Sequence, residues 1–234
     1  MKILGLIPAR GGSKGIPNKN IKLINGKPLL CYTAEAALES KKIDKVVLST
    51  DSEKIRKVGI SCGLEVPFIR PSILAEDDTP TLPVIDHALE YLNKNQNYIP
   101  DIVVLLQPTS PLRKAFHVDN AIDIFLDHKN ADSLVSIVQV PHNYNPYSIL
   151  IRNKKSIVKS FLDFPEKNNS RQKKPVFYAR NGAIYITNID CLINKKSMYG
   201  DKIISYLMDY KDSFDIDDEI DFLISEHLIK ENNL

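Results

Sequence analysis

The stretch from Ile3 to Asn20 contains the residue types that bind phosphate. It begins as an apolar run typical of a β-strand and turns at Pro8 into a loop with three glycines and the cations Arg10, Lys14 and Lys19. A strand that opens into a glycine-rich, basic loop before a helix presents backbone N–H groups and positive charge to phosphate. We therefore predict that this loop binds a nucleoside triphosphate.

The loop departs from two common phosphate-binding motifs. A Walker A loop needs Gly-Lys followed by Ser or Thr, whereas the order here is Gly12-Ser13-Lys14-Gly15, and only Gly12 and Gly15 fit a dinucleotide fingerprint. The loop also has more cations than a dinucleotide requires, as expected for a triphosphate that releases pyrophosphate. The alternative is a turn with solvated lysines, which the coincidence of strand end, glycines and cations disfavours.

A second candidate site is the segment Phe214-Asp-Ile-Asp217. In an extended segment, residues two apart project to the same side, so Asp215 and Asp217 can bind one hard cation such as Mg²⁺. The alternative is that Asp217 caps the last helix, with Asp218 and Glu219 favouring its positive end, and the local pattern taken alone favours this alternative.

The third candidate is Gln107-Pro-Thr-Ser-Pro-Leu-Arg113. Its prolines stiffen a turn that carries an amide, two hydroxyls and a guanidinium, which suits recognition of a polar ligand. A rigid strand-to-helix connection without a ligand explains the segment equally well.

Arginine is concentrated in these polar stretches. Seven of the 31 cations are Arg, and five of the seven lie in or beside the segments that we single out: Arg10, Arg70, Arg113, Arg171 and Arg180. Arg favours planar, bidentate contact with phosphate or carboxylate. The five histidines lack the spacing of metal ligands, and the chain has no nucleophile elbow of a serine hydrolase.

The chain alternates strand and helix patterns, which predicts an α/β fold with a doubly wound, mainly parallel (mixed) sheet that binds ligands at the carboxyl ends of its strands. The predicted strands are Lys2–Ile7, Asp44–Thr50, Glu65–Ile69, Asp101–Leu106, Ser133–Val140, Phe177–Ile186 and Lys202–Met208. The predicted helices are Pro28–Ser40, Glu53–Cys62, Leu82–Asn95, Ala115–Asp127 and Asp218–Lys230.

Composition and length restrict the class of protein. With 234 residues, 43% hydrophobic residues and a formal charge of +2, we expect one large domain over residues 1–234. This balance does not suggest a nucleic-acid partner, and no apolar run approaches the roughly 18 residues of a membrane helix. The three cysteines are widely spaced, so we expect no disulfide framework, reduced thiols and a cytoplasmic protein.

Five motifs in order resemble the acylneuraminate cytidylyltransferases, the CMP-sialic acid synthetases, over nearly the whole chain. They are Pro8 to Asn20, Ser49-Thr-Asp51, Gln107 to Arg113, Arg180-Asn-Gly-Ala-Ile-Tyr185 and Asp215-Ile-Asp217. The resemblance implies a nucleotidyltransferase fold of Rossmann-like type. It also implies a reaction in which the anomeric hydroxyl of a nine-carbon α-keto acid sugar attacks the α-phosphate of CTP and releases pyrophosphate.

The resemblance also implies roles for individual residues. The residues that would hold the nucleotide are Arg10, Gly11, Gly12, Ser13, Lys14, Lys19 and Asn20, with Arg70, Asp78 and Thr79 nearby. Those that would contact the acceptor sugar are Gln107, Arg171, Asn181 and Tyr185. Asp215 and Asp217 would bind Mg²⁺, and Arg10, Lys19 and Asp217 would act in catalysis.

The polar, irregular stretch over residues 140–175 resembles the family's protruding arm, which implies a homodimer whose arm completes the sugar pocket. Members acting on N-acetylneuraminic acid often have a Lys shortly after a His-Pro pair, and the segment from His142 to Ser148 has none. A legionaminic or pseudaminic acid is therefore as plausible an acceptor as sialic acid. Rival interpretations are an enzyme for another sugar such as Kdo, which the last two motifs disfavour, and a non-catalytic nucleotide-binding protein.

Overall fold

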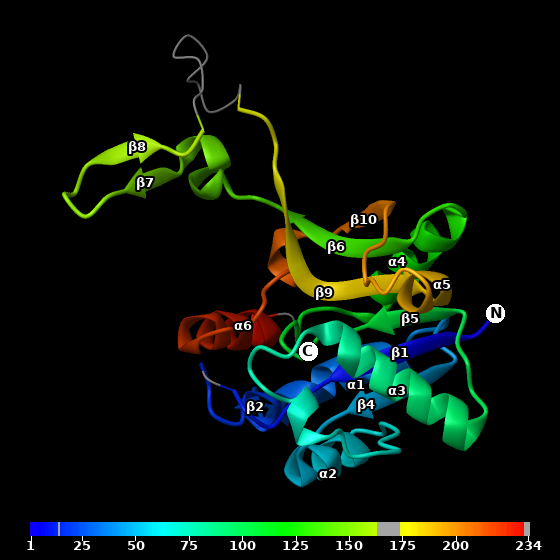
Figure 1. Cartoon of the computed structure of the whole chain (residues 1–234). Helices are drawn as coiled ribbons and strands as arrows, with labels where there is room; N and C mark the ends of the chain where they lie inside the picture. The colour runs from blue at the N-terminus through cyan, green and yellow to red at the C-terminus, as the bar shows by residue number, and fades with distance from the viewer. Residues whose placement is uncertain (14, 163–173, 232–234) are drawn as a thin grey trace.

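The computed structural model describes residues 1–13, 15–162 and 174–231 (Figure 1). A six-stranded sheet forms its centre, in the order β10-β6-β9-β5-β1-β4. The strands are β1 (Ile3–Pro8), β4 (Lys45–Ser49), β5 (Ile102–Leu105), β6 (Ser133–Gln139), β9 (Tyr178–Asn188) and β10 (Ile203–Leu207). β1 pairs in parallel with β4 and β5, and β10 with β6, whereas β9 runs antiparallel between β5 and β6. The prediction of a mainly parallel, mixed sheet is confirmed.

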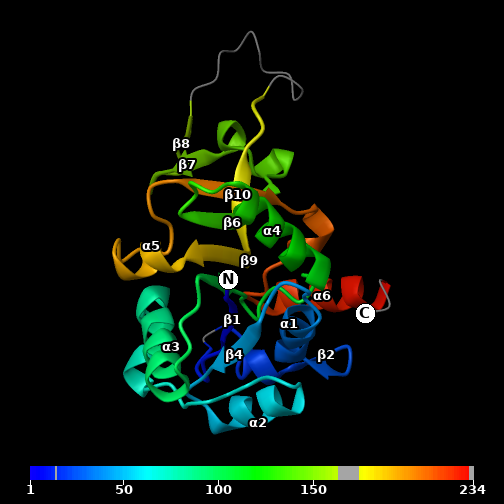
Figure 2. The same cartoon turned by 90° about the vertical axis from the view of Figure 1, so that its right-hand side faces the viewer.

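Helices cover both faces of this sheet (Figure 2). They are α1 (Leu29–Leu38), α2 (Glu53–Ser61), α3 (Thr81–Gln96), α4 (Ala115–Asp127), α5 (Ile189–Ile193) and α6 (Glu219–Glu231). One core contains apolar side chains of α1, α2 and α4, and the opposite core contains those of α3 and α5. β1 supplies both cores, with Ile3 and Ile7 on one face and Leu4 and Leu6 on the other, because side chains alternate along a strand.

Short elements connect these layers. A two-residue hairpin joins β2 (Leu23–Ile24) to β3 (Lys27–Pro28), and Asn25 and Gly26 both have positive φ, as that turn requires. The 3-10 turns are η1 (Lys19–Ile21), η2 (Ser72–Leu74), η3 (His142–Tyr144), η4 (Pro146–Ser148) and η7 (Tyr210–Asp212). No helix among the described residues has the length and apolarity that crossing a membrane demands.

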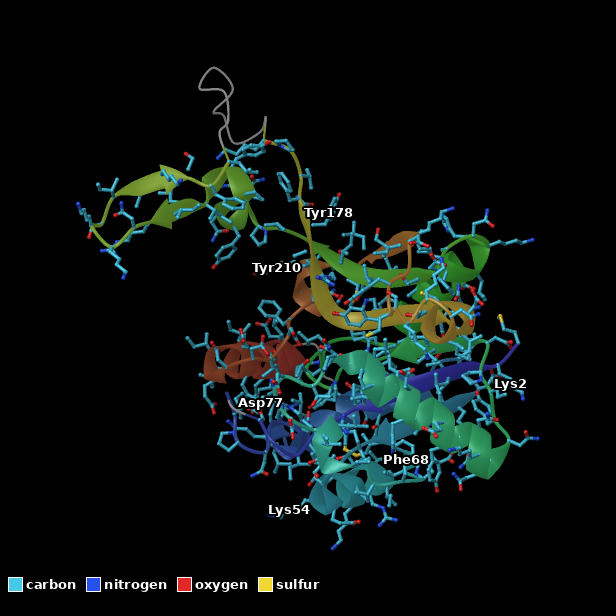
Figure 3. All side chains as sticks on the ribbon, in the orientation of Figure 1. Lys2, Lys54, Phe68, Asp77, Tyr178 and Tyr210 are labelled. Carbon is cyan, nitrogen blue, oxygen red and sulfur yellow. A yellow bond between two sulfur atoms is a disulfide. The ribbon has the colours of Figure 1, made fainter. Side chains whose placement is uncertain are left out.

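The segment after β6 leaves the body of the protein as a projecting arm (Figure 1). Its described part holds η3, η4 and the antiparallel hairpin of β7 (Leu150–Arg152) and β8 (Val158–Ser160). Tyr178 and Tyr210 lie where the arm meets the body (Figure 3). All six residues of β7 and β8 are exposed, so the hairpin makes little use of the protein's own core.

Two expectations from the sequence are wrong. Residues 65–69 form no strand: Glu65 makes a single bridge with Val47, and Pro67 lacks the N–H that a longer pairing would need. Cys31 and Cys62 form a disulfide with a Cα–Cα distance of 5.5 Å, because α1 and the end of α2 pack side by side on the same core. Cys191 is the buried free thiol.

A buried histidine links α4 to the loop before the last helix. His117 Nδ1 accepts a hydrogen bond of 3.0 Å from the Lys114 backbone N–H, and Nε2 lies 3.6 Å from Asp212 Oδ2. Burial lowers the pKa of His117 from 6.5 to about 4; the charge of Asp212 opposes this shift, while Lys114 and Arg113 reinforce it. The imidazole is therefore neutral at pH 7, with its Nε2 proton directed at the carboxylate.

This histidine makes the fold sensitive to mild acid. The unfolded chain binds a proton at His117 near pH 6.5 and the folded chain only near pH 4, so the stability present above this window is lost as the pH falls through it. Between pH 7 and pH 5 the wild type should lose about 2 kcal/mol more unfolding free energy than His117→Asn, which keeps an acceptor for the Lys114 N–H. Urea unfolding at both pH values measures the difference. His227→Asn, at an exposed position on α6, should behave as the wild type, and equal losses in the wild type and His117→Asn would contradict the assignment.

Candidate active site

The glycine-rich loop after β1 is fixed by contacts from the neighbouring strand end. The Gly11 N–H donates to Asp51 Oδ1 at 2.9 Å, and the buried Asn20 side chain donates to the Arg10 carbonyl at 2.9 Å. A Cβ at Gly11 would lie 3.1 Å from Ser52 Cβ, so glycine allows the close approach of loop and β4. Two segments forty residues apart therefore set the path of the loop together.

Arg70 is a buried residue of this site whose guanidinium has donors without hydrogen bonds. Its side chain is 4% exposed, and Nε and Nη2 have no hydrogen-bond partner among the residues described. Asp51 Oδ1 lies 3.7 Å from Nη2. Burial lowers the pKa of Arg70, while Asp51 raises it and Arg10 lowers it further. A buried guanidinium with unpaired donors is costly unless an anion completes it, so Arg70 points to an anionic ligand.

A cavity of about 230 Å³ opens at the carboxyl ends of β1 and β5. Its lining includes Arg10, Gly12, Ser13, Lys19, Asn20, Arg70, Thr79 and Gln107, eight of the residues predicted from the sequence. A wider hollow of about 650 Å³ shares Arg10 and Gly12 with it and adds Asp78. Arg10 itself forms an ion pair with Asp77 at 2.7 Å on the wall of this hollow. The charged side chains that line the smaller cavity are therefore basic, and those that line the wider, more open hollow are mainly acidic.

Lys19 brings the end of the chain to the loop. Its ammonium donates to the Ile216 carbonyl at 2.5 Å and lies 3.6 Å from Asp217 Oδ1. A Cβ at Gly15 would lie 2.3 Å from the Asp217 carbonyl oxygen, which only glycine avoids. The loop and the Asp215-Ile-Asp217 segment are thus direct neighbours.

The two predicted metal ligands lie in different environments. Burial raises the pKa of Asp215, the charge of Asp217 adds to this, and the Thr109 hydroxyl and Lys19 oppose it. Asp215 Oδ1 is buried without a hydrogen-bond partner in the described part of the chain, whereas the Asp217 side chain is 82% exposed. A carboxylate oxygen buried beside a second carboxylate is the arrangement that a hard cation completes.

Asp217 is not the cap of the last helix, so that alternative is wrong. Asp218 Oδ1 accepts from the backbone N–H groups of Ile220 at 2.8 Å and Asp221 at 3.0 Å, as an N-cap residue does. Asp221 Oδ2 accepts in return from the N–H groups of Asp217 and Asp218. The Asp217 carboxylate therefore remains available for a ligand.

The segment from Gln107 to Arg113 divides between cavity and interior. Gln107, Pro108 and Thr109 line the cavity, but Ser110 and Arg113 are fully buried, so the guanidinium does not face a ligand. Arg113 Nη1 donates to the carbonyls of Gln107 at 3.1 Å and Ala183 at 2.8 Å. Burial lowers its pKa to about 9, partly opposed by Asp215, which leaves it charged at neutral pH.

Of the predicted acceptor residues, Gln107 lines this cavity, whereas Asn181 and Tyr185 do not. Asn181 is buried, with Oδ1 accepting from Ser136 at 2.6 Å and Nδ2 donating to Ser213 at 2.9 Å. Tyr185 is partly exposed on β9, with its ring centre 6.5 Å from that of Tyr199. A Cβ at Gly182, whose φ is +75°, would lie 3.1 Å from Asp215 Oδ2 and 3.2 Å from Gln107 Oε1, so β9 borders both groups. Lys14 and Arg171 lie outside the described residues.

The comparisons with known proteins agree with this geometry. The family model described as cytidylyltransferase matches residues 4–233. The chain belongs to the cytidylyltransferase family. It is 38% identical over 237 residues to the CMP-N,N'-diacetyllegionaminic acid synthase of Legionella pneumophila, with 99% of this chain and 98% of that protein covered.

Two further proteins show how far the similarity extends. The N-acylneuraminate cytidylyltransferase of Escherichia coli O18:K1:H7 is 34% identical over 232 residues, 99% of this chain, and the chain spans about half (53%) of that protein's length. The solved structure of a CMP:2-keto-3-deoxy-manno-octonic acid synthetase complexed with CTP superposes with a TM-score of 0.75 at 17% identity, covering 99% of this chain and 100% of that one. The second likeness shows that this cytidylyltransferase has the Rossmann-like nucleotidyltransferase fold.

In the sequence, Asp51 is only one residue of the Ser49-Thr-Asp51 motif. In the structure its carboxylate accepts from the Gly11 N–H and lies beside the Arg70 guanidinium. Asp51→Ala should weaken CTP binding by about tenfold or more, because it removes the acceptor of the Gly11 N–H and the counter-charge of Arg70. Isothermal calorimetry on the folded variant measures this. Glu53→Ala, a nearby exposed acid whose partner is Arg56, should bind CTP as the wild type does. An unchanged dissociation constant in Asp51→Ala would show that the loop does not need this anchor.

Proposed function

We propose that this cytidylyltransferase joins CMP from CTP to the anomeric hydroxyl of a nine-carbon α-keto acid sugar and releases pyrophosphate. The observation that carries the proposal is the convergence of four features at one edge of the sheet: the glycine-rich loop, the buried Arg70 with two nitrogens that lack hydrogen bonds, Lys19, and two carboxylates. This edge is where open α/β sheets bind ligands. The family and its named relatives supply the chemistry.

The nucleotide half of the reaction rests on fixed positive charge. Backbone N–H groups of Gly12 and Ser13, with Asn20 beside them, would surround the phosphates. Gly11, whose N–H is bound to Asp51, would set the path of the loop, and Lys14 would add a further cation. Arg10 and Lys19 would neutralise the charge that develops as pyrophosphate leaves. Arg70 would contact the nucleotide from below, with Asp78 and Thr79 at the mouth. Charges held in place before the reaction need no reorganisation during it, which is how such sites lower the barrier.

The donor set fits Mg²⁺. Asp215 Oδ1 is buried without a partner and Asp217 is exposed beside it, and Mg²⁺ is commonly bound by one or two carboxylates together with substrate phosphates. Among the described residues no group of three or more acidic, His or Cys side chains is arranged to hold a metal ion, so water and substrate phosphates would have to complete the coordination. When bound, Mg²⁺ would supply charge stabilisation to the triphosphate.

The bond changes follow from the chemistry of phosphoryl esters. The anomeric oxygen forms a bond to the α-phosphorus while the bond from that phosphorus to the bridging oxygen of pyrophosphate breaks. The proton of the hydroxyl leaves to a phosphate oxygen, since no described histidine lines the cavity. Positioning and electrostatics therefore provide most of the acceleration.

The acceptor half is assigned to Gln107, Arg171, Asn181 and Tyr185. Gln107 lines the cavity and its amide lies beside Asp215, which is where the sugar must meet the nucleotide. An acceptor of the N,N'-diacetyllegionaminic type is favoured over N-acetylneuraminic acid. Two observations support this choice: the full-length match to the legionaminic synthase, and the segment from His142 to Ser148, which has no Lys.

The arm of residues 140–175 is proposed as a dimerisation element that also completes the acceptor pocket. Apolar side chains are exposed on both hairpin strands, among them Leu150, Ile151 and Val158. A cavity of about 910 Å³ lies at the foot of the arm and includes His142 and Tyr210 in its lining. Exposed apolar area of this kind marks interaction surfaces. We further propose one domain over residues 1–234, small molecules as the other partners, and a cytoplasmic location, where CTP is made.

A panel of acceptors tests the reaction. With CTP and Mg²⁺, pyrophosphate release should be fastest with N,N'-diacetyllegionaminic acid, slower with N-acetylneuraminic or pseudaminic acid, and absent with Kdo. A single missing hydrogen-bond partner for the sugar should cost about tenfold or more in kcat/KM, because it leaves a buried polar group unpaired. Turnover with Kdo alone would overturn the choice of acceptor, and no turnover with any acceptor would overturn the enzyme.

Two controls make the panel decisive. Asp217→Asn keeps the shape of the side chain but removes one proposed metal ligand, so the folded variant should lose most Mg²⁺-dependent turnover. Asp127→Asn, at an exposed acid at the end of α4 that lines neither of the two spaces, should keep the Mg²⁺ dependence of the wild type. Full activity in Asp217→Asn would remove this residue from the catalytic assignment.

The mass of the protein in solution tests the arm. Light scattering should give twice the chain's 26.5 kDa, about 53 kDa. The pair Leu150→Asp and Val158→Asp, on the same side of the hairpin, should give a monomer, because it places charge on the proposed contact. Ile60→Asp on α2, equally exposed, should leave the dimer intact. A dimer that survives the paired arm substitutions would contradict the role of the hairpin.

A further inference from the structure

Arg113 is the largest fully buried side chain of the described residues, and the proposed chemistry leaves it without a task. It lies near the end of the connection from β5 to α4 and is buried there, where Nη1 donates to the carbonyls of Gln107 and Ala183. Nε and Nη2 are buried with no hydrogen-bond partner in the described chain. Lys and Arg are almost never fully buried unless they are paired, so this position requires an explanation.

The neighbours of Arg113 are parts of the active site. Gln107 is the cavity residue assigned to the sugar, and Ala183 follows Gly182, the point where β9 passes between Gln107 and Asp215. Arg113 Nη1 therefore connects the backbone of the segment after β5, which carries Gln107, to the backbone of β9, which borders the site. A second tie is the hydrogen bond of 2.9 Å from the Ile216 N–H to the Thr109 carbonyl.

Charge connects Arg113 to Asp215 as well. Asp215 is the acidic group whose field acts on the guanidinium, and its Oδ1 is buried and unpaired like the free nitrogens of Arg113. Two uncompensated charges in a low-dielectric interior would each be costly, and opposite charges in one region offset that cost. β9 links the two residues geometrically, because Gly182, next to the Ala183 carbonyl that Arg113 binds, borders Asp215 Oδ2.

We propose that Arg113 is a positioning residue that fixes the separation between the sugar-binding amide of Gln107 and the metal-binding carboxylate of Asp215. It touches neither substrate. Its bonds to the Gln107 and Ala183 carbonyls fix the backbone that carries the amide and the part of β9, at Gly182, that borders Asp215 Oδ2. The inference rests on the proposed function, because it takes from it the roles of Gln107 and Asp215.

Binding measurements separate this role from general support of the fold. CTP is titrated into the full chain by calorimetry with and without Mg²⁺, using the wild type, Arg113→Met, Arg113→Lys and the matched control Arg56→Met, an exposed arginine on α2. Arg113→Met should keep the CTP affinity measured without Mg²⁺ within about twofold, while the gain in affinity on adding Mg²⁺ falls about tenfold or more. Arg113→Lys should lie between Met and wild type, because it keeps the charge but not the planar fork. Arg56→Met should match the wild type.

Other outcomes would overturn the inference. A folded Arg113→Met with a normal Mg²⁺ effect would do so, as would equal losses of affinity with and without Mg²⁺, which indicate general damage. If the Met variant does not fold, Arg113→Lys alone decides: a Mg²⁺ effect reduced by about threefold or more supports positioning, and an unchanged one refutes it. Failure of this inference can be distinguished from failure of the proposed function. The proposed function fails if the wild type shows no turnover with any acceptor of the panel, whereas the present test measures only the binding of CTP.

Discussion

The burial of Ile216 is the constraint on which the active site depends. Ile216 is fully buried in a cluster with Ile16, Leu29 and Tyr32, between the nucleotide loop and α1. In an extended segment, neighbours of a buried side chain project the other way, so burying Ile216 turns Asp215 and Asp217 together away from that cluster. The Lys19 ammonium then binds the Ile216 carbonyl and closes the loop against the segment. A hydrophobic contact thus fixes the register of the two carboxylates.

Around that contact, the site keeps several polar groups in an uncompensated state. Arg70, Arg113 and Asp215 each bury a polar atom that lacks a hydrogen bond in the described chain. Native interiors rarely tolerate such atoms, and each one costs stability. At Arg70 and Asp215 a polyanion and a cation would supply the missing partners. Arg113 differs from the other two, because its surroundings are backbone carbonyls and its effect on substrates must pass through Gln107 and Asp215.

The alternation of strands and helices predicted most of the fold, because apolar runs such as that of β5 report burial on both faces directly. The convergence of loop residues at the strand ends followed from the same rule, and eight of them do line one cavity. The antiparallel direction of β9 was not predicted, since a strand's pattern does not state its direction. The hairpin at Asn25 and Gly26 was not predicted either, although Asn-Gly is a typical pair for a two-residue hairpin turn.

Long-range pairing accounts for the other differences. The role of Asp51 depends on the meeting of β1 and β4, and the burial of Arg113 depends on β9, neither of which local spacing reveals. An arginine in a Pro-rich turn looks the same in sequence whether it faces a ligand or the interior. The disulfide of Cys31 and Cys62 likewise requires the packing of α1 on α2.

The two halves of the site are built on different principles. The nucleotide half rests on the interior: buried Ile216, the sheet edge and the helix that follows the loop hold its charges, so its geometry belongs to one chain. The acceptor half borders β9, which leaves the body to become one side of the exposed arm (Figure 1). In the dimer that we propose, covering the apolar, exposed hairpin of the arm would also restrain the strand that borders the acceptor pocket. Recognition of the sugar would then depend on assembly, whereas the residues proposed to bind CTP lie within one chain.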